Sequence, residues 1–246
     1  MSKKYENAPI IEAVCEFRLT PETQWDLTIP GLFYEKVREE FAKKEDHPIR
    51  EVTFAGTSQG LQQKVQAIER VRFLTDDKKT FVQLGPRVLS INKLKPYASW
   101  EEFKPKIEKA FTALTSVVEI NSIQRIGLRY INRIDISGQK VDMDEYFDFN
   151  PHLGKNLPQD MLNFIVGCTF PFHEGQDSCK IQLTDAIPND SESVSFILDL
   201  DYFLAKAETV AKDTALEWVE SAHDNLENVF EGCITGSLRK VFKEVD

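Results

Sequence analysis

Residues 122–137, SIQRIGLRYINRIDIS, constrain the fold of this chain more than any other stretch. Apolar and polar side chains alternate here with a period of two, which indicates a β-strand with one buried face. The buried face is expected to carry Ile126, Leu128, Tyr130, Asn132, Ile134 and Ile136. The opposite face is expected to carry Arg125, Gly127, Arg129, Ile131, Arg133 and Asp135. This is the longest strand that the sequence predicts, and its faces differ in polarity.

The first half of the chain predicts a strand, a helix, several short strands and a second helix. The first strand covers residues 10–20, and a helix over 31–44 ends at His47-Pro48. Strands follow over 49–55, 63–74, 79–84 and 87–94. The second helix covers 99–118. The main part of the second helix is expected to begin near Pro105, which lies deep for a first-turn proline. The short connections between the strands favour an antiparallel meander, because parallel crossovers need more residues.

The second half predicts the same order of elements. After residues 122–137 we expect a short helix over 142–148, strands over 161–171, 179–185 and 193–203, a helix over 213–231 and a last piece over 235–243. Residues 1–120 and 121–246 thus form two β-α-β(3–4)-α halves without a flexible linker. No clear sequence identity links them, so the repeat concerns element order alone. We expect an α+β fold, an antiparallel sheet with helices on one face, as in TATA-binding-protein-like or helix-grip architectures.

Composition and charge exclude several classes of protein. Among the 246 residues, 41% are hydrophobic, which suffices for a globular core. The formal net charge is −10, and an acidic protein is poorly suited to bulk phosphate contact, so nucleic-acid binding is disfavoured. No apolar stretch approaches the ~20 residues that cross a bilayer. The first residues lack an apolar signal region, and the four cysteines lack a C-x-x-C pair, so we expect a cytoplasmic protein with reduced, mostly buried thiols.

The arginine row of the central strand, Arg125, Arg129 and Arg133, allows two interpretations. Arginine forks suit phosphates, so the row could contact an anion or a nucleic acid. Alternatively, Glu12 and Glu16 of the first strand and Asp199 and Asp201 of the 193–203 strand neutralise it, if those strands flank it. We favour neutralisation. Gly127 marks a bulge or a place where something approaches the backbone closely.

Two polar residues fall on faces that are otherwise apolar. Asn132 lies on the buried face of the central strand, where a structural hydrogen bond to a loop or helix end is favoured over a ligand contact. His223 lies in the helical stripe of Leu216, Val219, Leu226 and Phe230. A core histidine is favoured there over a catalytic base, because no nucleophile partner is identifiable.

Known catalytic and cofactor motifs are absent from the sequence. It contains no G-x-G-x-x-G, Walker A, G-x-S-x-G or H-E-x-x-H pattern. The spacing of Cys168, His173 and Cys179 matches no standard zinc site, and no fourth ligand is evident. We therefore expect no metal and no cofactor. Asp199 and Asp201 could act as paired acids, but a solvated strand face explains them more simply.

Several segments resemble a sporadically distributed bacterial family of cytosolic proteins of about this length, which has no assigned function. The resemblance is carried by Pro9-Ile10-Ile11-Glu12-Ala13-Val14 with Glu16-Phe17-Arg18, by Pro96-Tyr97 with Trp100-Glu101 and Phe103, by the run 125–134, by 198–201, and by His223, Phe230, Ile234 and Thr235. It spans nearly the whole chain. It implies a bacterial or phage-related accessory protein, and the patchy distribution implies mobile or defence-linked loci. It carries over no catalytic residue.

These observations favour a non-enzymatic interaction or regulatory protein that binds a partner protein or a second copy of itself. One alternative is a nucleic-acid, nucleotide or anion binder that uses the arginine row. A second alternative is an enzyme that uses His223 or the acidic strand. The missing catalytic motifs and the acidic charge favour the first hypothesis.

Overall fold

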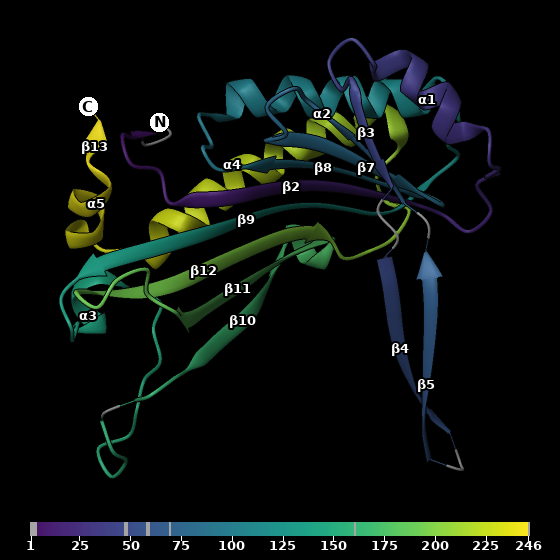
Figure 1. Cartoon of the computed structure of the whole chain (residues 1–246). Helices are drawn as coiled ribbons and strands as arrows, with labels where there is room; N and C mark the ends of the chain where they lie inside the picture. Colours follow the sequence, from purple (N-terminus) through teal and green to yellow (C-terminus); the bar gives the residue numbers. More distant parts are fainter. Residues whose placement is uncertain (1–3, 47–48, 58–59, 69, 160, 246) are drawn as a thin grey trace.

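A curved antiparallel sheet of nine strands forms the centre of the computed structural model (Figure 1). The structure describes residues 4–46, 49–57, 60–68, 70–159 and 161–245, with the backbone alone for 49–57 and 60–68. In spatial order the strands are β10 (Ile165–Phe172), β11 (Asp177–Ala186), β12 (Ser193–Leu204), β9 (Ile123–Ser137), β2 (Ile10–Leu19), β8 (Val88–Leu94), β7 (Thr80–Gly85), β6 (Val71–Leu74) and β3 (Lys43–Asp46). The α+β class with an antiparallel sheet is thereby confirmed.

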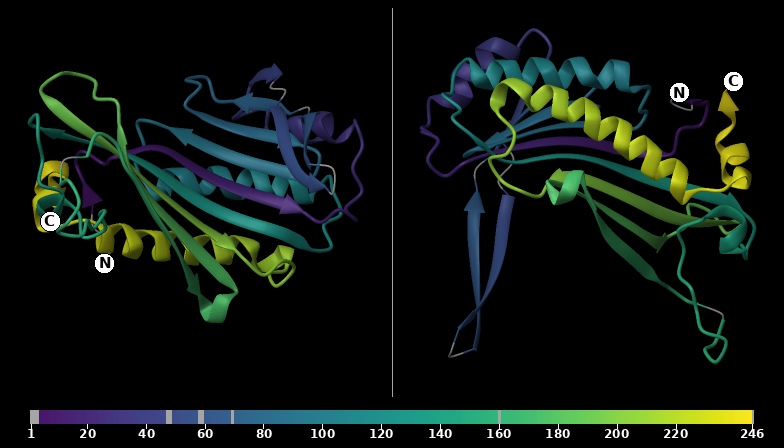
Figure 2. Two further views of the ribbon diagram at one scale, coloured as in Figure 1. Left: turned by 90° about the horizontal axis from the view of Figure 1, so that it is seen from below. Right: turned by 180° about the vertical axis from the view of Figure 1, so that it is seen from behind.

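Helices cover one face of this sheet and leave the other face open (Figure 2). Over the first half lie α1 (Ile29–Val37) and α2 (Trp100–Thr115), and α4 (Ala215–Cys233) crosses the second half. The short helices α3 (Met143–Tyr146) and α5 (Gly236–Phe242) lie at one end of the sheet. Near α5 the chain ends meet, where β1 (Lys4–Tyr5) pairs with β13 (Glu244–Val245). No helix among the described residues is long and apolar enough to cross a membrane.

The two halves join through their first strands. β2 pairs with β9 at the centre of the sheet, and Cys15 faces Leu128 there. In each half the last strand lies beside the first, so that β8 flanks β2 and β12 flanks β9. The remaining strands follow outward in reverse chain order. The two halves therefore share the order of their strands in space as well as along the chain.

A single hydrophobic core runs under the helices of both halves. The even-numbered apolar positions of β9 are buried there, as the alternation predicted, and Leu128 is fully buried. From β2, Phe17 stacks on Phe111 of α2 with ring centroids 4.3 Å apart. Burying one such large side chain stabilises the fold by about 1.5–3 kcal/mol. No separate core divides the halves among the described residues.

The structure corrects the predicted helix over 31–44. The helix α1 ends at Val37, and a turn brings Phe41 into the core before β3 begins at Lys43. Pairing with β6, where Lys44 faces Phe73, overrides the helical periodicity of this segment. His47 and Pro48 lie outside the described residues.

The predicted meander is also divided differently. β4 (Ile49–Thr57) and β5 (Gly60–Ile68) form a separate hairpin that projects on the side opposite the helices (Figure 1). The predicted strand over 63–74 is therefore two strands, β5 and β6. The helix α2 (Trp100–Thr115) begins at Trp100 and runs through Pro105, so the expectation that its main part begins near Pro105 is wrong.

Candidate functional site

The sequence-predicted site residues lie on opposite faces of the sheet. The three arginines of β9, with Glu12, Glu16, Asp199 and Asp201, belong to the open face. Asn132 and His223 lie on the helix-covered face, where both line the same cavity. The residues of the open face and those of the helix-covered face therefore cannot contribute to a single site.

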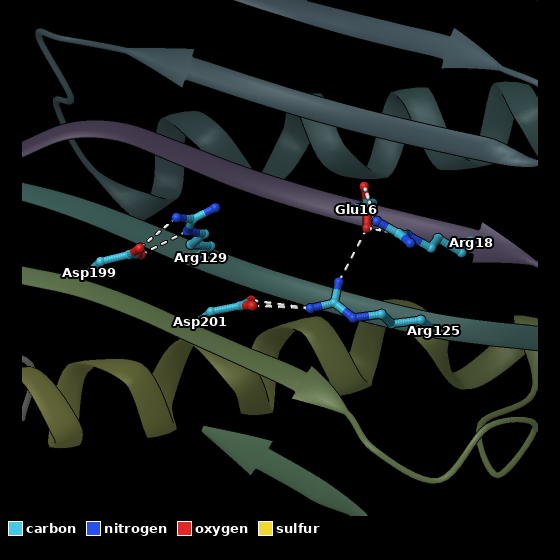
Figure 3. A network of polar contacts seen from close by, with 6 residues as sticks. All are labelled: Glu16, Arg18, Arg125, Arg129, Asp199 and Asp201. Atoms are coloured by element: carbon cyan, nitrogen blue, oxygen red, sulfur yellow. Dashed lines mark hydrogen bonds and ion pairs between the residues drawn. The ribbon is translucent and has the colours of Figure 1, made fainter. Parts of the chain in front are cut away.

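On the open face, Arg125 and Arg129 make ion pairs across neighbouring strands (Figure 3). The Arg125 guanidinium contacts Glu16 of β2 at 3.2 Å and Asp201 of β12 at 3.1 Å. Arg129 donates to both carboxylate oxygens of Asp199, at 2.7 and 2.5 Å. Glu16 and Asp199 are diagonal neighbours of their arginines, because Arg125 faces Arg18 and Arg129 faces Asp201 in the ladders. Arg125 extends further along the sheet to contact Asp201.

Gly127 lies between these two arginines for a steric reason. A Cβ atom on Gly127 would come within 2.7 Å of Arg125 Nη1. The absent side chain leaves room for the Arg125 guanidinium to lie across the strand between its two carboxylate partners. The expected close approach to the backbone is therefore made by this side chain.

Arg133 and Glu12 have other partners than the predicted ones. Arg133 contacts Asp135 of its own strand at 3.0 Å and donates to Ser195 Oγ at 2.9 Å. Its neighbour across β12 is Ile197, which offers no charge. Glu12 accepts a hydrogen bond from Asn92 at 2.8 Å. Every arginine of the row thus has a carboxylate partner, which favours the neutralisation interpretation.

On the helix-covered face, a cavity of about 780 Å³ opens between distant segments of the chain. The N-terminal segment contributes Tyr5, and the start of α2 contributes Trp100 together with the preceding Tyr97. β9 contributes Tyr130 and Asn132, and α4 contributes His223 and several carboxylates. We call this space the aromatic cavity. Its volume lies in the range of small-molecule sites.

A hydrogen-bonded chain crosses the wall of the aromatic cavity. The Tyr130 hydroxyl lies 2.8 Å from His223 Nδ1, and His223 Nε2 lies 3.3 Å from Glu227. The imidazole also stacks on Trp100, with ring centroids 4.2 Å apart. Burial lowers the pKa of His223 despite the nearby carboxylates of Glu227, Asp224, Glu220 and Glu101. A neutral ring then donates from Nε2–H to Glu227 and accepts the Tyr130 hydroxyl at Nδ1.

Tyr97 adds a buried hydroxyl to the same wall. Its ring centroid lies 5.9 Å from that of Tyr130. Burial is the largest cause that raises the pKa of both phenols, and Tyr97 contributes to the rise at Tyr130. The hydroxyl groups of Tyr97 and Tyr130 also interact with each other, which acts to lower the pKa of Tyr97 and to raise that of Tyr130.

Asn132 has the structural hydrogen bond that the sequence favoured, with a different partner. Its side-chain Nδ2 donates to the Leu198 carbonyl at 3.0 Å, which belongs to strand β12 rather than to a loop or helix end. Asn132 also lines the aromatic cavity.

Tyr5, Tyr97, Trp100, Glu220 and Glu227 were missed as site residues, because none has a diagnostic local pattern. The segments that carry these residues come together with Tyr130 and His223 only in the folded chain, so no local sequence signal marked the cavity.

Cys168, His173 and Cys179, whose spacing matches no standard zinc site, lie in and between strands β10 and β11. Cys168 and Cys179 lie on neighbouring strands but are not paired in the register, and His173 contacts Asp177 at 2.7 Å. Within the described ranges, no group of three His, Cys, Asp or Glu side chains could hold a metal ion. Cys15, Cys179 and Cys233 are buried as expected, whereas Cys168 is exposed.

The exposure of Cys168 reflects its position on the edge strand β10, which no helix covers. Half of the large hydrophobic side chains that are exposed in the described part of the chain lie in or just before this strand: Leu157, Met161, Leu162, Ile165 and Phe170. We call residues 157–170 the β10 segment.

No model of a known protein family matches the chain, and a comparison with curated proteins finds no match.

Proposed function

We propose that this protein is a non-enzymatic binding protein that docks a partner protein on the β10 segment. The observation that carries the proposal is the apolar exposure of this segment. In a soluble protein, large exposed hydrophobic side chains that follow one another along one segment indicate an interaction site, whereas singly scattered ones need no explanation. Leu162 is 99% exposed and Ile165 is 70% exposed, which leaves their apolar surface to water.

The two edge strands of the sheet differ in length and in charge, and this difference supports the proposal. The edge strand β3 has four residues, Lys-Lys-Glu-Asp, and all are charged and exposed. Short charged edges of this kind prevent pairing with other chains. The opposite edge strand β10 has eight residues without a charge, and six of them are exposed. Among the described strands β10 pairs with β11 alone, so its outer backbone groups can accept a further strand.

The partner is a protein that adds an extended segment along β10. Its alternate side chains would meet Cys168 and Phe170 on the helix side of the sheet. A different protein is favoured over a second copy, because two copies with a net charge of −10 repel each other. The resemblance to an accessory bacterial family supports a role in such a locus.

The alternatives have weaker support. The guanidinium groups that an anion or nucleic acid would use are engaged with carboxylates on the open face. For an enzyme that uses the acidic strand or His223, Asp199 and Asp201 are engaged with arginines, and His223 contacts Tyr130 and Glu227. These contacts leave the binding of a partner protein as the function that the geometry supports best.

The test compares purified complexes of three forms of the chain. Tagged wild type, Phe170→Lys and a control, Leu27→Lys, are isolated from the native host and weighed by native mass spectrometry. Leu27 is 91% exposed and lies before α1, far along the chain from β10. We expect one protein to accompany wild type and the control in equal stoichiometry. With that protein purified, Phe170→Lys should weaken binding about a hundredfold, as loss of an interface anchor does.

Three results would contradict the proposal. One is the absence of a stoichiometric protein partner from the wild-type complex. Another is undiminished binding of the partner to Phe170→Lys that circular dichroism shows to be folded. The third is a wild-type homodimer that Phe170→Lys dissociates, which would replace the partner by a second copy.

A further inference from the structure

We propose that the β4–β5 hairpin is a docking arm that packs one of its faces against the same partner protein that the β10 segment binds. We call residues 49–57 and 60–68 the arm. The proposal rests on the proposed function and adds a second region of contact to it. It is carried by the place of the arm in the chain, by the pattern of its two faces and by its position opposite β10.

The arm is inserted between two strands that do not need it in order to pair. β3 and β6 are antiparallel neighbours in the nine-stranded sheet, and Asp46 at the end of β3 faces Val71 at the start of β6. Strands that end side by side in this way can be joined by a turn of two residues. The chain instead runs through residues 47–70, and β4 and β5 form a separate two-stranded sheet. The nine-stranded sheet is therefore complete without the arm.

The two faces of the arm differ in polarity. Because Val52 faces Val65 in the register and side chains alternate along a strand, five apolar positions share one face: Val52, Phe54, Leu61, Val65 and Ala67. The positions of the other face are mostly polar: Glu51, Thr53, Gln62, Lys64 and Gln66. In the described part of the chain, the extensive contacts of β4 and β5 are with each other. A two-stranded hairpin is only marginally stable in water, and packing against a further layer stabilises it.

The arm and the β10 segment lie at opposite edges of the sheet and extend to the same side of it. β10 forms one edge, and the arm extends from β3 and β6 at the other edge. Both the arm and the residues that precede β10 extend away from the helices (Figure 1 and Figure 2). Ile165 of β10 is on this open face, because the ladder places it in line with Arg133 of β9 through Thr184 and Ile197. A partner that contacts Ile165 under the sheet therefore lies between the β10 segment and the arm.

The dimensions of the sheet match a folded domain as the partner. At a spacing of about 4.8 Å, nine strands extend over at most about 38 Å. A domain of about 100 residues is roughly 34 Å across, so it fits under the open face between the two edges. The nine residues of β4 give the arm a length of about 30 Å, which is enough to follow one side of such a domain.

The composition of the arm favours a protein over a nucleic acid or a membrane. Arg50 and Lys64 are its two basic residues and Glu51 is its acidic one, which is too little positive charge for a row of phosphates. Next to the turn, at 55–57 and 60, the chain has Ala, Gly, Thr and Gly instead of the large apolar side chains that enter a bilayer. An apolar face bordered by polar positions suits the surface of a protein.

The first test removes the arm from the full chain. Residues 47–70 are replaced by Asn-Gly, the preferred two-residue turn between antiparallel strands. The probe is the purified protein that accompanies the wild type in native mass spectrometry, and its Kd is measured by isothermal titration calorimetry. We expect the variant to melt within about 4 °C of the wild type, because the sheet is complete without the arm. We expect it to bind the partner about tenfold to a hundredfold more weakly.

The second test keeps the arm and changes one face at a time. A variant with Val52→Thr, Phe54→Thr and Val65→Thr retains residues that favour strands, and we expect it to bind the partner about tenfold more weakly. The matched control changes the same number of residues to threonine on the other face, with Glu51→Thr, Lys64→Thr and Gln66→Thr, and should bind within about twofold of wild type. In the wild type, the amide hydrogens of the arm should exchange about tenfold more slowly in the complex than in the free chain.

The outcomes separate this proposal from the proposed function. If removal of the arm and the change of its apolar face both leave the Kd unchanged while Phe170→Lys weakens binding, the arm proposal is wrong and docking on β10 stands. An equal loss in the two face variants also contradicts it. If the wild type has no protein partner, both proposals fail. If removal of the arm instead dissociates a wild-type homodimer, or abolishes binding to phosphatidylcholine–phosphatidylglycerol vesicles, the arm binds a second copy or a membrane and the proposal is overturned.

Discussion

Asn132 shows how a single polar residue is accommodated in the core. It is 1% exposed, and its amide donates to the Leu198 carbonyl at 3.0 Å. We expect Asn132→Ala to lower the free energy of unfolding by about 1–3 kcal/mol, the cost of a lost buried hydrogen bond and its packing. Urea denaturation measures this loss. Asn228→Ala, an exposed residue of the same cavity lining, is the matched control and should change little.

His223 gives the molecule a stability that depends on pH. Burial lowers its pKa below the ordinary value of 6.5, so the unfolded chain binds a proton more readily than the folded chain. The folded state is therefore penalised as the pH falls below about 6.5. We expect His223→Gln to reduce the loss of stability between pH 7 and pH 5, measured by urea midpoints. An equal loss in wild type and variant would contradict this assignment.

At the scale of elements, α2 contains a proline that its geometry does not need. Pro105 lies inside the helix and is exposed, so it removes a backbone hydrogen bond without contributing packing. We expect Pro105→Ala to raise the free energy of unfolding by about 1 kcal/mol or more. Thermal denaturation checks the gain. A loss of stability would mean that the proline contributes through the unfolded chain instead.

The ion pairs that join β2, β9 and β12 predict an unequal response to substitution. Removing Arg125 leaves the part-buried carboxylate of Asp201 without its ion-pair partner, whereas Glu16 keeps its contact with Arg18 at 2.7 Å. Burial raises the pKa of Asp201, so its charge is already disfavoured there. We expect Arg125→Met to cost about 1–3 kcal/mol and Asp201→Asn to cost less than 1 kcal/mol. Similar losses in the two variants, measured by urea denaturation, would contradict this account.

Elements also differ in how well local pattern predicted them. α4 and β9 were predicted within two residues at each end, because each has a long and regular hydrophobic period. The apolar residues around Phe41 have helical spacing, but the segment continues into strand β3. Pairing of β3 with β6 stabilises this segment more than a further helical turn would. The exposure of β10 could not be predicted, because its apolar pattern is the same as that of a buried strand.

The whole molecule should unfold as one unit. The sheet and the hydrophobic core pass through the junction of β2 and β9 without interruption. We expect coincident urea transitions when Trp25 alone reports on the first half and Trp218 alone on the second, in variants with the other tryptophans replaced by phenylalanine. Two separated midpoints would instead show that residues 1–120 and 121–246 are independent domains.

The sequence by itself determined the faces of the central strand, the helical stripe that holds His223 and the acidic charge. These properties follow from backbone periodicity and composition, which need no knowledge of distant contacts. The tertiary structure alone decided that Arg125 pairs with Glu16 and Asp201, that Tyr97 and Trp100 meet His223, and that β10 is left uncovered. Strand order and chain closure bring those residues together, and neither is encoded in the spacing of neighbouring residues along the chain.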